Sequence, residues 1–157
     1  MLHNDLETIF GFLLTDVTRM YRAALDKSVI SRGLSLTPGE IRTLVHIARY
    51  EGVRQAVLAE RMGIEPMTVS AYIDRLEAYG LVTRQTDPRD RRAKLVSVTA
   101  KADQVFEEVR PIISATHEMM MDGIAQEDRD LLVSMLIEMR ARLTSTPAPV
   151  IPLVKVA

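Results

Sequence analysis

The sequence predicts a mainly α-helical fold with one small β-hairpin, an α+β arrangement, in a chain of 157 residues. Over most of the chain, apolar residues recur every three to four positions, which is the period of an amphipathic helix. Directly after Gly80 the pattern changes to alternation in two short segments, and this change indicates two strands. Hydrophobic residues make up 47% and charged residues 26% of the chain, which is typical of a globular protein.

The first two helices are expected at residues 5–29 and 38–50. In the first helix, apolar side chains at three- and four-residue steps form one continuous stripe. The second helix starts at a capping box, in which Thr37 caps the helix, Pro38 fits its first turn and Glu40 completes the box. Both segments therefore carry the pattern of helices that bury one face.

The next pair of helices carries the most information. A short helix at Gln55–Met62 is broken by Gly63, and Pro66 opens a second helix that runs to Tyr79 and ends at Gly80. Two helices joined by a tight turn that contains glycine form the helix-turn-helix pattern, although a plain helical hairpin gives the same signal. The outer face of the second helix is expected to present Met67, Thr68, Ser70, Ala71, Asp74 and Arg75.

A basic hairpin follows these helices. Residues 81–86 and 94–98 have strand composition, and the polar turn at residues 87–92 joins them. Residues 81–98 hold five basic and two acidic residues, whereas residues 100–145 hold five basic and nine acidic residues. A wing that follows the DNA backbone needs such a basic tip, whereas a hairpin that only packs against protein does not. The overall net charge of -1 therefore hides a local positive patch that is compatible with nucleic acid.

The C-terminal part is expected to contain two further helices. Thr99 is placed to cap a helix at residues 100–123, which Pro111 is expected to kink. A last helix is expected at residues 127–143. Residues 144–157 contain three prolines and no helical period, so they predict an extended or disordered arm.

The helix-turn-helix and hairpin residues resemble those of the MarR family of regulators, and most closely those of its SlyA-like branch. The resemblance lies in Gly63–Ser70, Ile73–Glu77 and Gly80–Val82, and in the wing Asp87–Lys94. It extends in detail over about residues 36–102, and the flanking helices agree in length and order. The implied fold is a winged helix-turn-helix with a helical dimerisation lobe.

The resemblance also implies a division into three parts. Residues 35–99 would form the DNA-binding lobe, residues 1–34 and 100–145 the dimerisation lobe, and residues 146–157 a proline-containing tail. The apolar stripes of the dimerisation lobe are wide enough to need a second protein surface. A two-fold homodimer would place two recognition helices about 34 Å apart on a pseudo-palindromic operator in double-stranded DNA.

The resemblance also implies roles for individual residues of the DNA-binding lobe. The last arginine of the wing motif, here Arg92, would enter the minor groove, and the acid two residues before it, Asp90, would hold its side chain. Arg75 would either bind a DNA phosphate or form an ion pair within the protein. Ala71 stands where many relatives carry an arginine, so it can touch a thymine methyl group but not bind guanine in a bidentate way. The expected DNA-binding set is Pro66, Met67, Thr68, Ser70, Ala71, Arg75, Arg89, Asp90, Arg91 and Arg92.

Family members commonly bind small aromatic or phenolic acids between the two lobes. The resemblance therefore implies a repressor that a small aromatic carboxylate effector releases from DNA. Such a ligand needs an apolar cleft with a cation for its carboxylate. The candidate cations, each of which also fits the role of an ordinary solvated or interface residue, are Arg19, Arg22, Arg42 and His46.

Catalytic, metal and cofactor sites are not predicted. His3, His46 and His117 lie far apart, and no glycine-rich phosphate loop or nucleophile elbow occurs. The chain has no cysteine, no apolar run long enough to span a bilayer and no signal-peptide pattern at its start, so a cytoplasmic location is expected. We therefore expect a sequence-specific DNA-binding transcriptional regulator and not an enzyme. A winged-helix protein–protein adaptor and an architectural DNA binder without a ligand are the alternatives.

Overall fold

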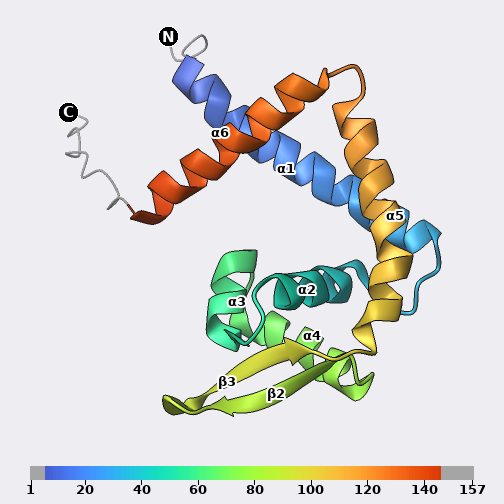
Figure 1. The fold of residues 1–157 in the computed structure, drawn as a ribbon, viewed down its shortest axis with the longest axis vertical. Helices are drawn as coiled ribbons and strands as arrows, with labels where there is room; N and C mark the ends of the chain where they lie inside the picture. Colours follow the sequence, from blue (N-terminus) through green and yellow to red (C-terminus); the bar gives the residue numbers. More distant parts are fainter. Residues whose placement is uncertain (1–5, 146–157) are drawn as a thin grey trace, which may run out of the picture. The chain divides into compact units, whose positions relative to one another are not determined.

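The computed structural model describes residues 6–145, which form six helices and three strands (Figure 1). The mainly helical class with a small antiparallel sheet is thereby confirmed. The chain divides into two units, residues 1–117 and residues 118–157. The elements are α1 (Leu6–Ser31), α2 (Pro38–Arg49), β1 (Val53–Arg54), α3 (Gln55–Met62), α4 (Pro66–Ala78), β2 (Val82–Asp87), β3 (Asp90–Val98), α5 (Ala102–Met121) and α6 (Gln126–Ser145).

The predicted capping box starts α2. The Thr37 hydroxyl accepts the backbone N–H of Glu40 at 3.3 Å, and Glu40 Oε2 accepts the backbone N–H of Thr37 at 2.7 Å. Pro38 occupies the first turn, where its missing N–H costs nothing. These contacts satisfy two of the free backbone donors at the start of the helix.

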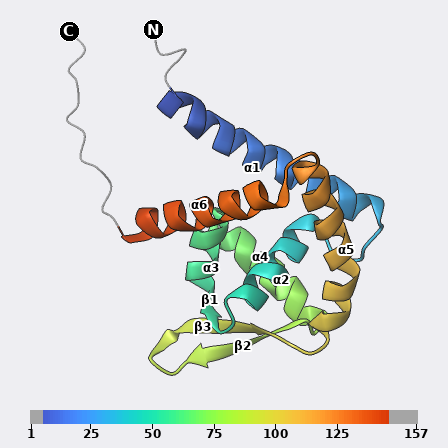
Figure 2. The same cartoon turned by 45° about the horizontal axis from the view of Figure 1, so that its top comes forward.

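The helix pair α3 and α4 begins and ends close to the predicted residues. Gly63 closes α3 in the left-handed conformation at φ 62°, which a side chain would strain. Helices α2, α3 and α4 pack together beside the β2–β3 hairpin (Figures 1 and 2). The hydrophobic core of this unit includes the wholly buried side chains of Ile47, Leu58, Val69, Ile73, Leu76 and Val96.

The sheet has three strands, one more than the sequence predicted. Its order is β1-β3-β2 and both pairings are antiparallel, with Val53 opposite Val96 in the added strand. A two-residue strand is too short to show alternation, so no sequence pattern indicated it. The turn between β2 and β3 is also shorter than expected, because β2 reaches Asp87 and β3 begins at Asp90. The basic tip of the hairpin is therefore largely strand.

The start of α5 differs from the prediction. The helix begins at Ala102, and the Thr99 hydroxyl donates a hydrogen bond of 2.7 Å to the carbonyl oxygen of Gly80. Thr99 thus ties the end of β3 to the end of α4 instead of capping the helix. Pro111 lies inside α5, which continues to Met121, and the expected kink stays a prediction.

The second unit contains the end of α5, the turn at Gly123 and helix α6. Arg129 joins these parts, because its guanidinium donates to the carbonyl oxygens of Met121 at 2.7 Å and Ile124 at 2.9 Å and pairs with Glu118 at 2.9 Å. No residue of α6 is buried, although the helix carries many large apolar side chains. The predicted tail at residues 146–157 lies outside the described residues.

Candidate nucleic-acid interface

Helix α4 divides cleanly into a buried and an exposed face. Val69, Ile73 and Leu76 are wholly buried and hold the helix against the core. The opposite face contains most of the residues predicted to contact DNA. Pro66, Met67, Thr68, Ala71 and Arg75 are exposed there, and Ser70 is half-buried.

Arg75 is held by a buried carboxylate. Its Nε lies 2.8 Å from Glu40 Oε1, whose side chain is wholly buried, while the Arg75 side chain remains 57% exposed. The contact is an ion pair that lacks hydrogen-bond alignment. The Tyr79 hydroxyl and then the Glu40 carboxylate raise the pKa of Arg75. Of the two roles predicted for Arg75, the structure contains the ion pair within the protein. Part of the Arg75 side chain still faces solvent.

Arg84 joins the base of the wing, formed by β2, β3 and their turn, to helix α4. Its NH2 group lies 2.6 Å from Asp74 and its NH1 group 2.8 Å from Glu77, both of which are on α4. The same side chain donates a hydrogen bond to the carbonyl oxygen of Ser70 at 3.4 Å. The Arg84 side chain is only 19% exposed, whereas its partners Asp74 and Glu77 are 62% and 42% exposed.

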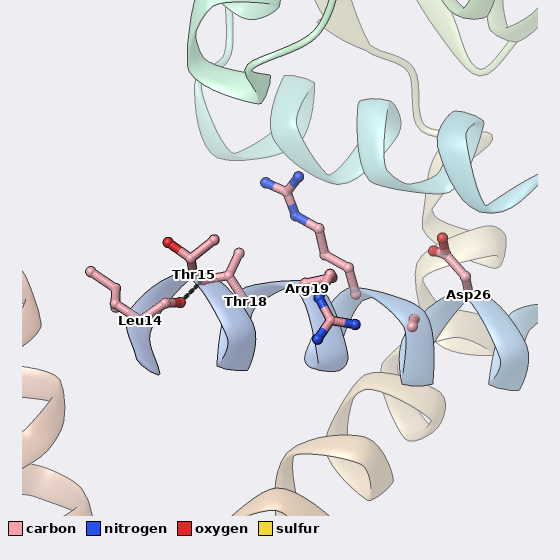
Figure 3. Close-up of a pocket in the computed structure, with 7 residues that line it drawn as sticks. Leu14, Thr15, Thr18, Arg19 and Asp26 are labelled. Carbon is pink, nitrogen blue, oxygen red and sulfur yellow. Dashed lines mark hydrogen bonds between the residues drawn. The ribbon is translucent and has the colours of Figure 1, made fainter. Parts of the chain in front are cut away.

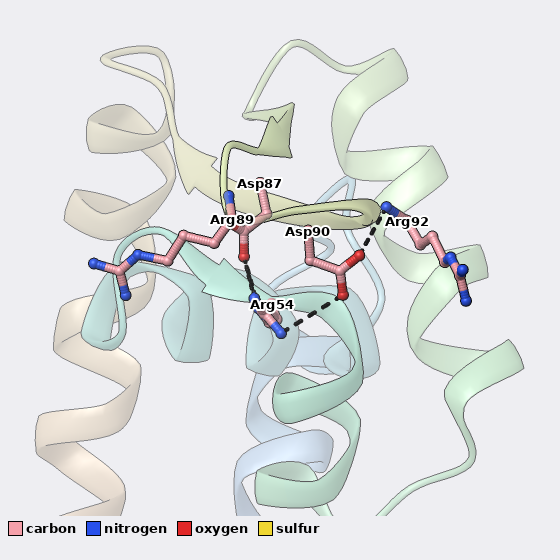
Figure 4. A network of polar contacts seen from close by, with 5 residues as sticks. All are labelled: Arg54, Asp87, Arg89, Asp90 and Arg92. Carbon is pink, nitrogen blue, oxygen red and sulfur yellow. Dashed lines mark hydrogen bonds and ion pairs between the residues drawn. The ribbon is translucent and has the colours of Figure 1, made fainter.

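The tip of the wing is organised by Arg54 (Figure 4). Arg54 Nε donates to Asp87 Oδ2 at 2.7 Å, and Arg54 NH1 lies 4.0 Å from Asp90. Asp87 also accepts the backbone N–H of Arg89 at 2.8 Å. The hydrogen bond from the Arg89 backbone lowers the pKa of Asp87 most. Burial raises this pKa, and Arg54 lowers it again. One buried carboxylate therefore joins the turn of the wing to the start of α3.

Asp90 holds Arg92 in a different way from the one predicted. Asp90 Oδ1 accepts the backbone N–H of Arg92 at 3.1 Å, and Figure 4 shows the Arg92 guanidinium pointing away from Asp90. The acid thus orders the main chain at the tip and leaves the arginine side chain extended. Arg89, Arg91 and Arg92 are all exposed.

A concave surface lies between the wing and the first turns of α3 and α4. It has a volume of about 450 Å³. Two of its groups, Arg92 and Lys94, are cationic side chains of β3, and the start of α4 adds the positive end of a helix dipole. Such a surface suits the phosphates of a nucleic-acid backbone. The lining residues are Arg54, Gln55, Ala56, Pro66, Asp90, Arg92, Ala93 and Lys94.

Comparison with known proteins identifies the family. The MarR family model matches residues 36–94. A MarR-family transcriptional regulator from Rhodococcus sp. RHA1 is 30% identical over 90% of this chain and 94% of that one, with a TM-score of 0.66. This chain belongs to the MarR family.

Two further solved structures are similar to this chain along most of their length. CouR from Rhodococcus jostii RHA1, in a structure bound to p-coumaroyl-CoA, is 29% identical over 94% of this chain and 99% of that chain, with a TM-score of 0.67. The transcriptional regulator SlyA is 26% identical over 83% of this chain and 93% of its own, also with a TM-score of 0.67. SlyA is one match among several, so the SlyA-like branch stays a prediction.

MarR membership makes this chain a DNA-binding transcriptional regulator and not an enzyme, as the sequence predicted. It favours DNA binding over the adaptor alternative. None of the helices within residues 6–145 combines the length and the apolar character needed to cross a membrane.

The four candidate effector-binding residues of this MarR protein lie on α1 and α2. Arg19 and Arg22 line one pocket along α1, where Arg19 also pairs with Asp16 at 3.0 Å. Arg42 pairs with Asp26 of α1. Burial is the largest cause of a lowered pKa at His46, and Arg49, Arg22, Arg42 and Arg61 lower it further. Of the candidate cations, Arg22 and Arg42 thus lie close enough to His46 to lower its pKa.

Four residues that order this MarR interface were missed by sequence reasoning: Glu40, Arg54, Arg84 and Asp87. Arg54 and Asp87 are 33 positions apart in the chain, and Glu40 and Arg75 are joined only by the packing of α2 on α4. The capping box accounts for Glu40 without Arg75, and the basic composition of the wing accounts for Arg84 without α4. No periodic or motif signal links such distant partners, because periodicity reports one element at a time.

Proposed function

We propose that the protein is a homodimeric repressor that binds a pseudo-palindromic operator through two copies of α4 and two wings. The observation that carries this proposal is the exposed outer face of α4 beside an Arg92 side chain that extends from an ordered wing tip. Helix α4 would occupy the major groove and Arg92 the adjacent minor groove. The positively charged surface between them would follow the phosphates.

Homodimer formation is supported by unpartnered apolar side chains on the predicted dimerisation lobe, residues 1–34 and 100–145. A second copy of the chain would cover these side chains and set the spacing of two DNA-binding lobes, residues 35–99, on the operator. A single chain that left such a surface exposed would be prone to association. The exposed side chains are Ile9, Phe10, Phe12, Leu13, Leu14, Val17 and Met20 on α1, and Leu131, Leu132, Val133, Met135, Leu136, Ile137, Met139 and Leu143 on α6.

We further propose that a small aromatic anion releases the repressor. The relative CouR has been solved with an aromatic acyl thioester, p-coumaroyl-CoA. In this chain, Arg19, Arg22, Arg42 and His46 would provide the positive charge. An apolar pocket of about 450 Å³ between α2 and α5 could receive the aromatic group, and it is lined by Val45, Ala48, Phe106, Val109, Arg110, Ile113, Ser114 and His117. The α4 and wing residues favour the SlyA-like branch for this regulator.

The DNA part is tested by fluorescence anisotropy on duplexes from the DNA upstream of the gene, titrated with salt. We expect tight binding to one pseudo-palindrome, and a loss of about 1–3 kcal/mol on Arg92→Ala because a minor-groove charge contact disappears. Arg140→Ala on α6 provides the control, since it removes an exposed arginine far along the chain from the interface. Equal binding by both variants would contradict the proposed role of Arg92.

The effector part is tested on the same complex with 4-hydroxycinnamate and its coenzyme A thioester. Release of the operator by either compound supports a regulated repressor. Operator affinity that neither compound changes would favour the ligand-independent architectural binder.

A further inference from the structure

A pocket of about 540 Å³ runs along α1 on the side of α2 (Figure 3). The Thr18 hydroxyl donates to the carbonyl oxygen of Leu14 at 2.8 Å, and the Thr15 hydroxyl donates to that of Gly11 at 3.0 Å. Because these hydroxyl hydrogens are used within the helix, the donors left in the pocket are guanidinium groups. The lining residues are Leu14, Thr15, Thr18, Arg19, Arg22, Ala23 and Asp26.

Positive charge gathers beside this pocket without matching negative charge. We call Arg22, Arg42, His46, Arg49 and Arg61 the cation cluster. Arg22, Arg42, Arg49 and Arg61 all act electrostatically on His46. Arg42 is paired with Asp26, whose carboxylate points toward α2 in Figure 3. Among residues 9–145, whose side chains the structure describes, no carboxylate lies at ion-pair distance from Arg22, Arg49 or Arg61.

Tyr50 helps to hold two of these arginines together. The Arg61 guanidinium lies 3.8 Å from the centre of the Tyr50 ring, and the Arg49 guanidinium lies 5.8 Å from it. The His46 ring is 6.3 Å from the same ring. An aromatic face attracts cations without neutralising them, so the positive charge of the cluster remains available to a ligand.

His46 has an unused polar atom inside the cluster. Its Nδ1 is buried and has no hydrogen-bond partner in the described part of the chain. Buried polar atoms of native proteins are nearly always paired, so an unpaired one calls for an explanation. An anion bound beside the cluster would stabilise a protonated His46 by its charge.

We propose that the cation cluster and the α1 pocket bind the phosphate-bearing part of the effector, a group with two or more negative charges such as a diphosphate. The proposal rests on the effector response proposed above and defines its ligand class more closely. A simple aromatic carboxylate brings one charge, which one guanidinium satisfies. Four arginines, of which only Arg42 has a carboxylate partner among the described side chains, match a diphosphate better, because guanidinium groups bind phosphate oxygens in a bidentate way.

The test uses calorimetry on the full chain with inorganic pyrophosphate, coenzyme A and 4-hydroxycinnamate, at equal ionic strength and pH 7.5. We expect pyrophosphate and coenzyme A to bind more tightly than 4-hydroxycinnamate. Arg22→Gln and Arg61→Gln should each weaken pyrophosphate binding about tenfold, since each removes a charged hydrogen-bonding group. Arg32→Gln, an exposed arginine just beyond α1, is the matched control and should bind as the wild type does.

Two further measurements sharpen the test. Pyrophosphate should raise the pKa of His46, which NMR of the imidazole ring measures. The pKa of His46 should rise equally in Arg92→Ala, and this result would exclude pyrophosphate binding at the wing. The proposal is overturned if pyrophosphate and coenzyme A do not bind, or if Arg22→Gln and Arg61→Gln bind them as Arg32→Gln does. Operator binding measured on the same preparations separates this failure from failure of the repressor function. Anion binding that leaves operator affinity unchanged would support the site and contradict the effector response.

Discussion

At the scale of single residues, buried carboxylates order groups of the proposed DNA interface. Asp87 joins the turn of the wing to Arg54, and Glu40 joins the first turn of α2 to Arg75. In both cases an acid with little or no exposed side chain meets an arginine that is partly exposed. The acid therefore holds the arginine in one direction, which lowers the entropy that a DNA contact would cost.

Asp87 gives a prediction about pH. Its pKa in the folded protein is below the ordinary value of 3.8, so its contribution to stability is complete above that pH. The contribution is lost as the pH falls through the lower, folded-state pKa. Asp87→Asn should therefore lower the melting temperature at pH 7, and the difference from the wild type should shrink below about pH 4.

Thermal unfolding followed by circular dichroism between pH 2.5 and pH 7.5 checks this prediction. Asp122→Asn removes an exposed carboxylate of the same type and serves as the control. A deficit of Asp87→Asn that is the same at every pH would mean that packing, and not the charge of Asp87, stabilises the wing.

At the scale of the elements, the structure links helix α4 to α2 and to the wing by different means. Towards α2 the link is the Glu40–Arg75 ion pair together with a close approach at Gly39, where an added Cβ would lie 2.5 Å from the Tyr72 ring. Towards the wing the link is Arg84. Because α2 also carries Arg42 and His46, a ligand that moved α2 would act directly on the recognition helix.

Arg84 gives the prediction at this scale. Arg84→Gln would leave Asp74 and Glu77 without their counter-charge on the helix that we propose to face DNA, so we expect operator affinity to fall about tenfold. Folding stability should change little, by about 1 kcal/mol or less, because both acids are more than one-third exposed.

Anisotropy titrations of a triple variant identify the cause of this loss. Adding Asp74→Asn and Glu77→Gln to Arg84→Gln should restore most of the operator affinity, because the two repelling charges are removed. If the triple variant binds as weakly as Arg84→Gln alone, the position of the wing and not the charge of α4 is responsible.

At the scale of the whole molecule, α6 is the element that needs a partner. It has no buried residue, yet its apolar side chains occur around most of its circumference. A helix that is apolar on several sides is stable in water only where other surfaces cover it. The proposed homodimer supplies that cover, and DNA binding to a two-fold operator would depend on it.

Leu132→Glu combined with Leu136→Glu should convert the dimer to monomers. Each leucine contributes about 1.5–3 kcal/mol when buried, and each dimer would lose four of them. Size-exclusion chromatography with light scattering checks the mass, and operator binding should weaken together with dimer formation. Arg140→Glu also adds an acid to α6 but removes no apolar surface, so it should remain dimeric. A double variant that stays dimeric would place the interface elsewhere.

The sequence by itself determined the helices, the helix-turn-helix, the hairpin and the face of α4 that is exposed. These features follow from local patterns: a capping box at Thr37, glycines at helix ends, and a change of period after Gly80. The wing motif also sufficed to suggest the MarR family, which the comparisons confirm.

Only the tertiary structure decided how these parts are joined. The two-residue strand β1, the Thr99–Gly80 hydrogen bond and the pairings made by Glu40, Arg54 and Arg84 connect residues that no local pattern relates. A charged residue on a helix or strand has the same sequence signature whether it faces water or a distant partner. Its partner is chosen when the core packs and brings two elements together, because only then does burial make pairing of the charge necessary.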